Sequence, residues 1–350
     1  MKNSRESGVE LLRVISLLGV IFIHYSDILL SVLDTNGIET FFVHVLRTLS
    51  AASVDVFLII SGYFMCMNNK RTFGKPIDLI VQVSFYGILI YLIEVFIKYS
   101  HFSVSILIGN LIPDSYFTTF FVIVYVLSPY INVLLQKLNR SELNILMIYL
   151  LLIFSVYSTA TTIFDELSNT KWMGLNSVGA WGSQQGFNIV NFILCYIVGA
   201  YLRFNDSPIF TNRLKLSVIV SIIVILVSWS FFENRLDIPG MRSALVYDNP
   251  LVIVMGALSF VFFKDIKFNS DKVNKCAKLV YPTFLIHCFI ISKVHVESFC
   301  TISILHLIVH FIVFTILMFA ISFLFHSVYY FLIGKHIAKL DKYTIITIKE

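Results

Sequence analysis

Long apolar runs separated by short polar segments form the dominant pattern of the chain, and the run from Leu216 to Phe232 contains no charged residue. The period-two alternation that marks the strands of a membrane β-barrel is absent. A membrane-spanning helix needs about 20 apolar residues, so we predict an all-α, polytopic integral membrane protein with about ten transmembrane helices. The predicted spans are residues 9–32, 43–67, 77–97, 116–136, 143–160, 187–204, 216–232, 249–264, 279–296 and 301–333.

One further apolar stretch, Phe102–Ile112, is too short to cross a bilayer and is followed by Pro113. We interpret it as an interfacial or re-entrant segment. The first apolar run begins near Val9 and is longer than the apolar region of a cleavable signal peptide, so we expect a retained first helix. No internal repeat divides the sequence, which predicts a single transmembrane domain over residues 1–350 without an appended soluble domain.

Lysine and arginine residues are distributed unevenly between the predicted connecting segments. If the N-terminus is cytoplasmic, 19 of the 26 lie in cytoplasmic segments, six lie in outer segments, and Arg13 lies within the first span. Positive residues are enriched on the cytoplasmic side of membrane proteins. The bias therefore predicts that both the N-terminus and the C-terminus are cytoplasmic, which requires an even number of spans.

The composition narrows the class of protein further. Only 13% of the residues are charged, whereas an ordinary soluble domain has about 25%, so a soluble enzyme and a disordered chain are excluded. The net charge of +5 is small and scattered, and we expect no nucleic-acid partner. The five cysteines are odd in number, lie mostly in apolar runs and lack metal-ligand spacing, which predicts buried thiols instead of a disulfide framework.

Four polar residues interrupt the first span: Glu10, Arg13, His24 and Asp27. Titratable groups within a span are costly and therefore point to function. Arg13 and His24 are eleven residues apart in the sequence, which places them on nearly the same helix face and roughly 16 Å apart along the axis. The i, i+3 spacing allows Glu10 to pair with Arg13 near the cytoplasmic edge and His24 to pair with Asp27 deeper in the membrane.

A carboxylate beside an imidazole fixes the tautomer of the ring and raises its basicity, as a general base requires. The spacing suggests that His24, oriented by Asp27, removes a proton from a hydroxyl, while Arg13 receives an anion from the cytoplasm. The alternative is structural: Glu10 and Arg13 form an interfacial ion pair, and His24 is a buried histidine with satisfied hydrogen bonds. Four polar groups on one span favour the functional interpretation.

The second span carries Asp55 in an apolar run, where a carboxylate needs a partner. Arg13 and His24 on the neighbouring helix are the candidates. Ser61 and Gly62 follow in the same span, and small residues allow another helix to pack closely.

Two histidines in the last span, His306 and His310, have an i, i+4 spacing that suits metal ligands. No third ligand accompanies them in the sequence. We therefore expect no metal site.

Two predicted outer loops, residues 161–186 and 233–248, are long enough to bind a ligand. The first contains Trp172 and Trp181 among Asn, Gln and Ser residues, a composition that suits stacking on sugars and hydrogen bonding to hydroxyl groups. The alternative is that these tryptophans belong to an aromatic belt at the membrane interface. We expect the two loops to face the outer side of the membrane.

The motifs resemble those of the acyltransferase 3 family of membrane acyltransferases over nearly the whole chain. In the family an Arg is followed by ten residues and a His, as from Arg13 to His24 in GVELLRVISLLGVIFIHY. The segment VDVFLIISGYF, residues 54–64, is similar to the family's second motif. Weaker similarities are the aromatic span YFTTFFVIVYVLSPYIN, residues 116–132, and the segment TFLIH, residues 283–287.

The resemblance implies transfer of an acetyl group from acetyl-CoA to a sugar hydroxyl of a cell-surface or exported polysaccharide, in the inner membrane of a bacterium. His24 would be the catalytic base and Arg13 its essential partner, with Asp27 or Asp55 orienting the histidine. No permanently bound cofactor is implied; the partners are acetyl-CoA, the glycan acceptor and the lipid bilayer.

The resemblance also implies a binding site for each substrate. The phosphates of CoA would meet Arg13 and the basic segment Lys70, Arg71 and Lys75, although the Arg-x-x-Arg pattern of many members is missing and the same charges fit a positive-inside signal. We expect the acceptor to meet His287, at the end of the TFLIH segment, and, from the composition of the outer loop, Trp172 and Trp181. Some members carry an outer SGNH-type domain that completes transfer; this chain has none, so it would act alone or pass the acyl group to another protein.

Three other functions remain open at this point. One is transfer of a succinyl or other acyl group by the same fold. Another is a carrier or flippase for lipid-linked sugars, with the intramembrane charges lining its pathway. The absence of inverted repeats and of matching Gly- or Pro-broken helices disfavours transport. The third is a non-catalytic partner in a polysaccharide synthase complex.

Overall fold

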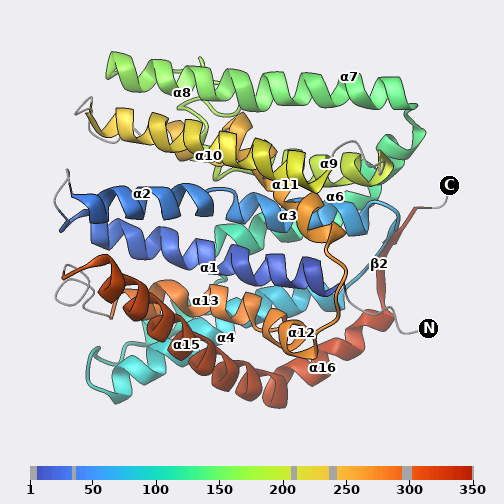
Figure 1. Ribbon diagram of the computed structural model, residues 1–350. Coiled ribbons are helices and arrows are strands. Elements are labelled where there is room, and N and C mark those ends of the chain that lie inside the picture. Colours follow the sequence, from blue (N-terminus) through green and yellow to red (C-terminus); the bar gives the residue numbers. More distant parts are fainter. Residues whose placement is uncertain (1–5, 34–36, 206–210, 236–242, 294–301, 349–350) are drawn as a thin grey trace.

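The computed structural model describes residues 6–33, 37–205, 211–235, 243–293 and 302–348. Within them the chain is almost entirely helical (Figure 1). The main helices are α1 (Ser7–Leu30), α2 (Ile38–Ser50), α3 (Ser53–Met65), α4 (Gly74–Phe96), α5 (Val104–Gly109), α6 (Tyr116–Lys137), α7 (Arg140–Leu151), α8 (Tyr157–Ser168), α9 (Ile189–Phe204), α10 (Asn212–Arg235), α11 (Pro250–Asp265), α12 (Asp271–Ala277), α13 (Val280–Ile291), α15 (Ile304–Tyr329) and α16 (Lys335–Ile337).

Eight helical segments among the described residues are long and apolar enough to cross a membrane. Two shorter apolar helices, α9 and α13, coincide with the other two predicted spans. The prediction of an all-α, multi-pass membrane protein is therefore confirmed, while the number of crossings and the side on which the termini lie stay predictions. The segment α5 has only six residues, too few to cross a bilayer, in keeping with its interpretation as a piece that does not cross.

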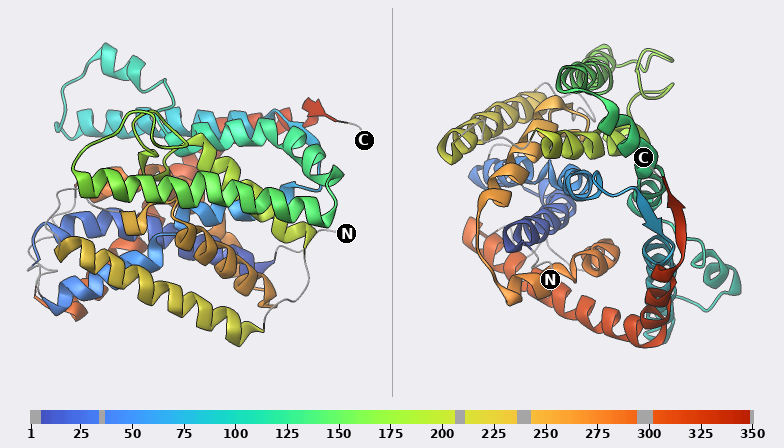
Figure 2. Two further views of the ribbon diagram at one scale, coloured as in Figure 1. Left: turned by 90° about the horizontal axis from the view of Figure 1, so that it is seen from above. Right: turned by 90° about the vertical axis from the view of Figure 1, so that its right-hand side faces the viewer.

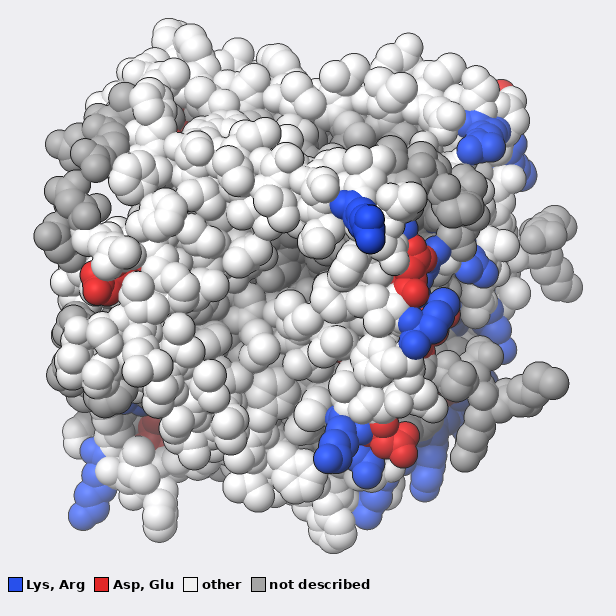
Figure 3. All heavy atoms as spheres, in the orientation of Figure 1, with Lys and Arg blue, Asp and Glu red and all other residues white. Residues whose placement is uncertain are grey.

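The two ends of the described chain lie at the same end of the bundle (Figure 1). There the strand β1 (Lys70–Thr72) pairs antiparallel with β2 (Thr344–Thr347), with Arg71 opposite Ile346. Sequence patterning missed this sheet because strands of three and four residues are too short to show a periodicity. Lys and Arg side chains gather towards this end on the face drawn in Figure 3, whereas the middle of that face is uncharged. The clustering follows the predicted charge bias.

The second predicted span is not one continuous helix. α2 ends at Ser50 and α3 begins at Ser53, and the sequence between them, Ala51–Ala52, contains neither Gly nor Pro. The break places Asp55 in the first turn of α3, where the positive end of the helix dipole favours a carboxylate. Because no breaker residue signals this interruption, the prediction of one uninterrupted helix over 43–67 was wrong, although Ile38–Met65 is still one candidate membrane span.

α1 and the α2–α3 pair lie inside the bundle (Figure 2). Their most apolar windows are 61% and 72% buried, more than those of the other long spans. α3 packs closely on α9: a Cβ added to Gly62 would lie 1.9 Å from the Tyr196 carbonyl oxygen, and one added to Gly199 would lie 2.0 Å from the Ile59 carbonyl oxygen. This confirms the predicted close approach at Gly62 and fixes α3 at the centre of the fold.

Candidate active site

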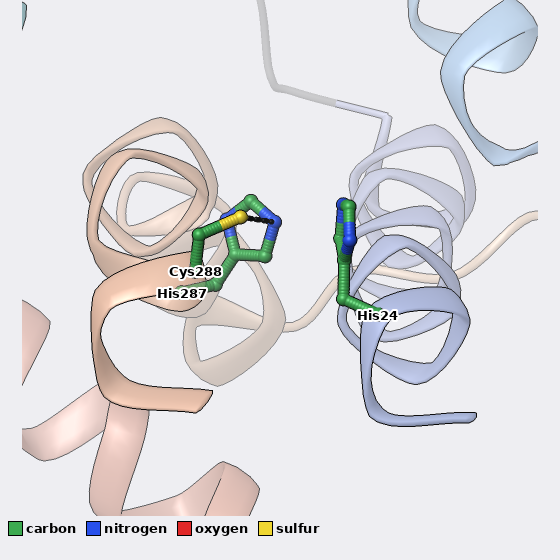
Figure 4. A group of neighbouring side chains, drawn as sticks. All are labelled: His24, His287 and Cys288. Atoms are coloured by element: carbon green, nitrogen blue, oxygen red, sulfur yellow. Dashed lines mark hydrogen bonds between the residues drawn. The ribbon is translucent and has the colours of Figure 1, made fainter. Parts of the chain in front are cut away.

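Two histidines from distant parts of the sequence face each other across the bundle interior (Figure 4). His24 lies on α1 and His287 on α13, two helices that pack together. Their ring centroids are 5.1 Å apart and the rings are inclined by 48°. His287 is 4% exposed, whereas the His24 side chain is accessible. We call His24, His287 and the adjacent Cys288 the histidine site.

The hydrogen bonds of His287 define which of its nitrogens is available. Nδ1 contacts the backbone carbonyl oxygen of Phe284, so Nδ1 carries a hydrogen and donates it. In the neutral ring Nε2 is then the acceptor, and the Cys288 thiol donates to it with a sulfur–nitrogen distance of 3.3 Å. The Nε2 lone pair therefore faces Cys288 Sγ, and a ring nitrogen of His24 lies within 4.8 Å of both atoms.

Asp27 has a partner other than the predicted one. Its Oδ1 forms an ion pair with Nη1 of Arg47 on α2 at 2.7 Å, and Arg47 also donates to the Ser26 hydroxyl at 3.1 Å. No hydrogen bond joins Asp27 to His24 among the described residues, although both Asp27 and Arg47 lie within electrostatic range of the imidazole. Sequence reasoning missed Arg47 because it counted this residue only as an outer-side cation.

Asp55 also lacks the predicted contact with Arg13 or His24. It is 1% exposed, and its Oδ1 accepts a hydrogen bond from the side-chain amide of Asn191 on α9 at 3.1 Å. Its Oδ2 has no hydrogen-bond partner among the described residues. The carboxylate therefore belongs to the α3–α9 contact, and its predicted partnership with the first helix was wrong.

At the other end of α1, Arg13 and Glu10 form the predicted ion pair, with a distance of 2.9 Å between Nη1 and Oε1. Arg13 keeps 34% of its side chain exposed. Arg13 and Arg71 both repel the ammonium group of Lys75, so these three cations share one neighbourhood. We call Arg13, Arg71 and Lys75 the cation group.

Arg71 has a structural environment within this group. It is 3% exposed. Its guanidinium donates to the Ser128 hydroxyl at 2.8 Å and to the backbone oxygens of Asn68, Lys70 and Met65 at 2.6, 2.8 and 3.2 Å. The backbone acceptors lie at and just after the end of α3, so Arg71 caps that helix terminus and also connects it to Ser128 on α6. Most of its donors are therefore already used.

Lys75 lies against aromatic rings instead of carbonyl groups. Its Nζ is 5.3 Å from the centroid of Phe121 and 5.8 Å from that of Tyr125, both on α6. Lys70, by contrast, is exposed at the start of β1. Of the predicted CoA-binding residues, Arg13 and Lys75 are therefore the two that share a neighbourhood and retain unused hydrogen-bond donors.

The predicted acceptor residues are spread over two regions. His287 belongs to the histidine site. Trp172 and Trp181 are 50% and 62% exposed in the segment between α8 and α9, and Trp172 Nε1 donates to the Ser168 hydroxyl at 3.3 Å. Within the described residues no contact joins either tryptophan to the histidine site.

The two predicted outer loops join each other. The backbone nitrogen of Tyr247 donates to the carbonyl oxygen of Gln185 at 3.1 Å, and the Ser158 hydroxyl on α8, just before the first loop, donates to Asp248 Oδ2 of the second at 2.6 Å. Residues 236–242 of the second loop lie outside the described residues. The contacts fix these loops at the end of the bundle opposite β1 and β2 (Figure 1).

A bundle of apolar helices with histidines facing each other in its interior defines a multi-pass membrane protein with a candidate proton-transfer site. A family model described as an acyltransferase domain, acyltransferase 3, matches residues 6–327. The chain belongs to this family, as its motifs predicted, and is a membrane acyltransferase. No curated protein and no solved structure matches it.

Proposed function

We propose that the protein transfers an acetyl group from acetyl-CoA to a hydroxyl group of a cell-surface or exported polysaccharide in the bacterial inner membrane. The observation that supports this most directly is the position of His24. It is accessible, it faces a second histidine, and it lies on the same helix as Arg13, roughly 16 Å away along the axis. α1 thus carries an anion-binding residue and a base, and the distance between them suits the long pantetheine arm of CoA.

The proposed reaction assigns a task to each group. Arg13 and Lys75 bind the phosphates of acetyl-CoA at the basic end of the bundle. His24 accepts the proton of the acceptor hydroxyl as its oxygen attacks the thioester carbonyl carbon. The carbon–sulfur bond then breaks, and the proton on His24 passes to the departing CoA thiolate. The products are the acetyl ester and free CoA, and His24 returns to its neutral state.

Two neighbours position His24 in this proposal. His287 holds one face of the ring, and its own orientation is fixed by the Phe284 carbonyl group. The Asp27–Arg47 ion pair places a compensating carboxylate near the imidazolium that forms during the reaction. The exposed Trp172 and Trp181 suit the first contact with an extended glycan at the opposite end from Arg13.

The test compares strains that carry histidine variants at equal membrane levels of the protein. His24→Ala should abolish acetylation of the surface glycan. His101→Ala is the matched control, since His101 is an exposed histidine in the segment between α4 and α5, and it should leave acetylation unchanged. Full acetylation in the His24→Ala strain would refute the proposal. A panel of acetyl-, succinyl- and longer acyl-CoA donors with the purified protein identifies the donor.

A further inference from the structure

The histidine site contains three groups that bind transition metals. His24, His287 and Cys288 each offer one ligand atom, and these atoms lie within 4.8 Å of one another. We propose that they bind a single ion of the Zn²⁺ class and that this ion blocks acyl transfer by occupying the lone pair of His24. The binding itself does not depend on the proposed function, whereas the inhibition rests on it.

The spacing of the ligand atoms fits such an ion after a small adjustment. With zinc–sulfur and zinc–nitrogen bonds of about 2.3 and 2.0–2.1 Å, tetrahedral ligand atoms are about 3.3–3.6 Å apart. Cys288 Sγ and His287 Nε2 already lie 3.3 Å apart. The His24 ring, which is accessible and makes no hydrogen bond among the described residues, supplies the remaining adjustment by rotating about its side-chain bonds.

The orientation of His287 matches that of a metal ligand. A metal-bound histidine almost always donates its other ring N–H to a carbonyl or carboxylate oxygen, which fixes the ring. In this protein Nδ1 donates to the Phe284 carbonyl oxygen and leaves Nε2 for the metal. Three protein ligands leave a fourth tetrahedral position for water, the arrangement of an open zinc site.

The ligand chemistry selects the kind of ion. Thiolate and imidazole ligands favour Zn²⁺ and related transition metals, whereas Mg²⁺ and Ca²⁺ prefer oxygen ligands. Binding releases the Cys288 thiol proton to solvent, so the thiolate cancels one of the two positive charges of the ion. The neighbouring Asp27–Arg47 ion pair carries no net charge.

The first experiment uses Co²⁺ as a spectroscopic probe on the purified full-length protein. One ion should bind per chain with a thiolate-to-cobalt charge-transfer band, and Zn²⁺ should displace it. Cys288→Ala should lose the band. Cys276→Ala should retain it, because Cys276 is the matched exposed cysteine outside the site. A folded wild type that binds no Co²⁺, or a band that persists in Cys288→Ala, would overturn the proposal.

Other thiols and histidines are controlled in the same experiment. Cys66 is fully buried and its thiol donates to the Tyr63 carbonyl oxygen at 3.4 Å, so this thiol should not contribute to the band. His306→Ala should bind Co²⁺ like the wild type, since the Nδ1 atoms of His306 and His310 contact the hydroxyls of Ser303 and Tyr25. Loss of the band in His306→Ala would place the metal on the last helix instead and contradict the proposal.

A second experiment measures inhibition as the ratio of activity with and without Zn²⁺ within each variant. Removing a direct ligand should weaken inhibition more than about 100-fold, since loss of an outer-shell partner alone costs about 10–100-fold in metal affinity. If the Zn²⁺ concentration that inhibits the wild type also inhibited Cys288→Ala, the proposed site would be contradicted. If the protein binds cobalt but its metal-free form transfers no acyl group, the metal site is supported and only the proposed function is refuted.

Discussion

The histidine site and the cation group each include one residue of α1, His24 and Arg13, yet their side chains are held in different ways. In the cation group Arg13 pairs with Glu10, and Arg71 is buried with most of its donors on neutral oxygens. In the histidine site no described carboxylate hydrogen-bonds to His24, which faces another titratable ring. The difference indicates that Arg71 stabilises the fold, whereas His24 is free to exchange a proton.

The largest loss of activity is expected at His24. In purified protein His24→Gln should lower kcat by about 10²–10⁴, the usual contribution of a general base, because glutamine cannot accept the proton. The melting temperature in detergent should stay within a few degrees of the wild type, since the side chain is accessible. The two measurements are the initial rate of CoA release and a thermal melt. If His24→Gln kept the wild-type rate, or if it lost stability together with activity, the distinction between the histidine site and the cation group would be refuted.

Arg71 should show the opposite combination. Arg71→Gln removes the charged donor of the buried Ser128 hydroxyl and of the Met65 and Asn68 carbonyl oxygens, which keep the Asn132 amide, and hydrogen bonds to a charged group contribute about 1.5–3 kcal/mol. We expect a lower melting temperature and reduced membrane levels. Lys70→Gln is the matched control: Lys70 is exposed, and surface substitutions usually change stability by less than about 0.5 kcal/mol. Equal melting temperatures for the two variants would show that the contacts of Arg71 do not stabilise the fold.

The Asp27–Arg47 ion pair allows a charge-balanced test near His24. Asp27→Ala leaves the Arg47 guanidinium unpaired beside a base that must itself become a cation, so kcat should fall by about tenfold, or about 1.4 kcal/mol. Asp27→Ala with Arg47→Ala removes both charges and should recover much of that loss. A double variant as impaired as Asp27→Ala would show instead that Asp27 acts directly on His24, as the i, i+3 spacing alone suggested.

Sequence reasoning succeeded where the relevant neighbours are close in the chain. The spans follow from local hydropathy, and the Glu10–Arg13 pair follows from helix spacing. It failed where partners come from different helices. Asn191 meets Asp55 only because α3 and α9 cross at Gly62, and His287 meets His24 across 263 positions of sequence. Such pairings depend on helix packing, which a single hydropathy pattern does not encode.

Asp55 gives the smallest expected effect and separates a structural carboxylate from a catalytic one. In Asp55→Asn the remaining side-chain oxygen can still accept the hydrogen bond from Asn191, and the new amide group replaces an oxygen that has no described partner. We expect kcat within about threefold of the wild type, since a loss of that size is below the contribution of a catalytic proton-transfer group.

The control at this position is Asp55→Leu, which removes the acceptor altogether. It should destabilise the protein by about 1–3 kcal/mol, because the buried Asn191 amide then lacks a partner. Thermal melts and CoA release measured on both variants distinguish the roles. If Asp55→Asn folded normally but lost activity about 100-fold or more, Asp55 would belong with His24 in the chemistry, and the buried carboxylate of α3 would be a second reacting group instead of a packing contact.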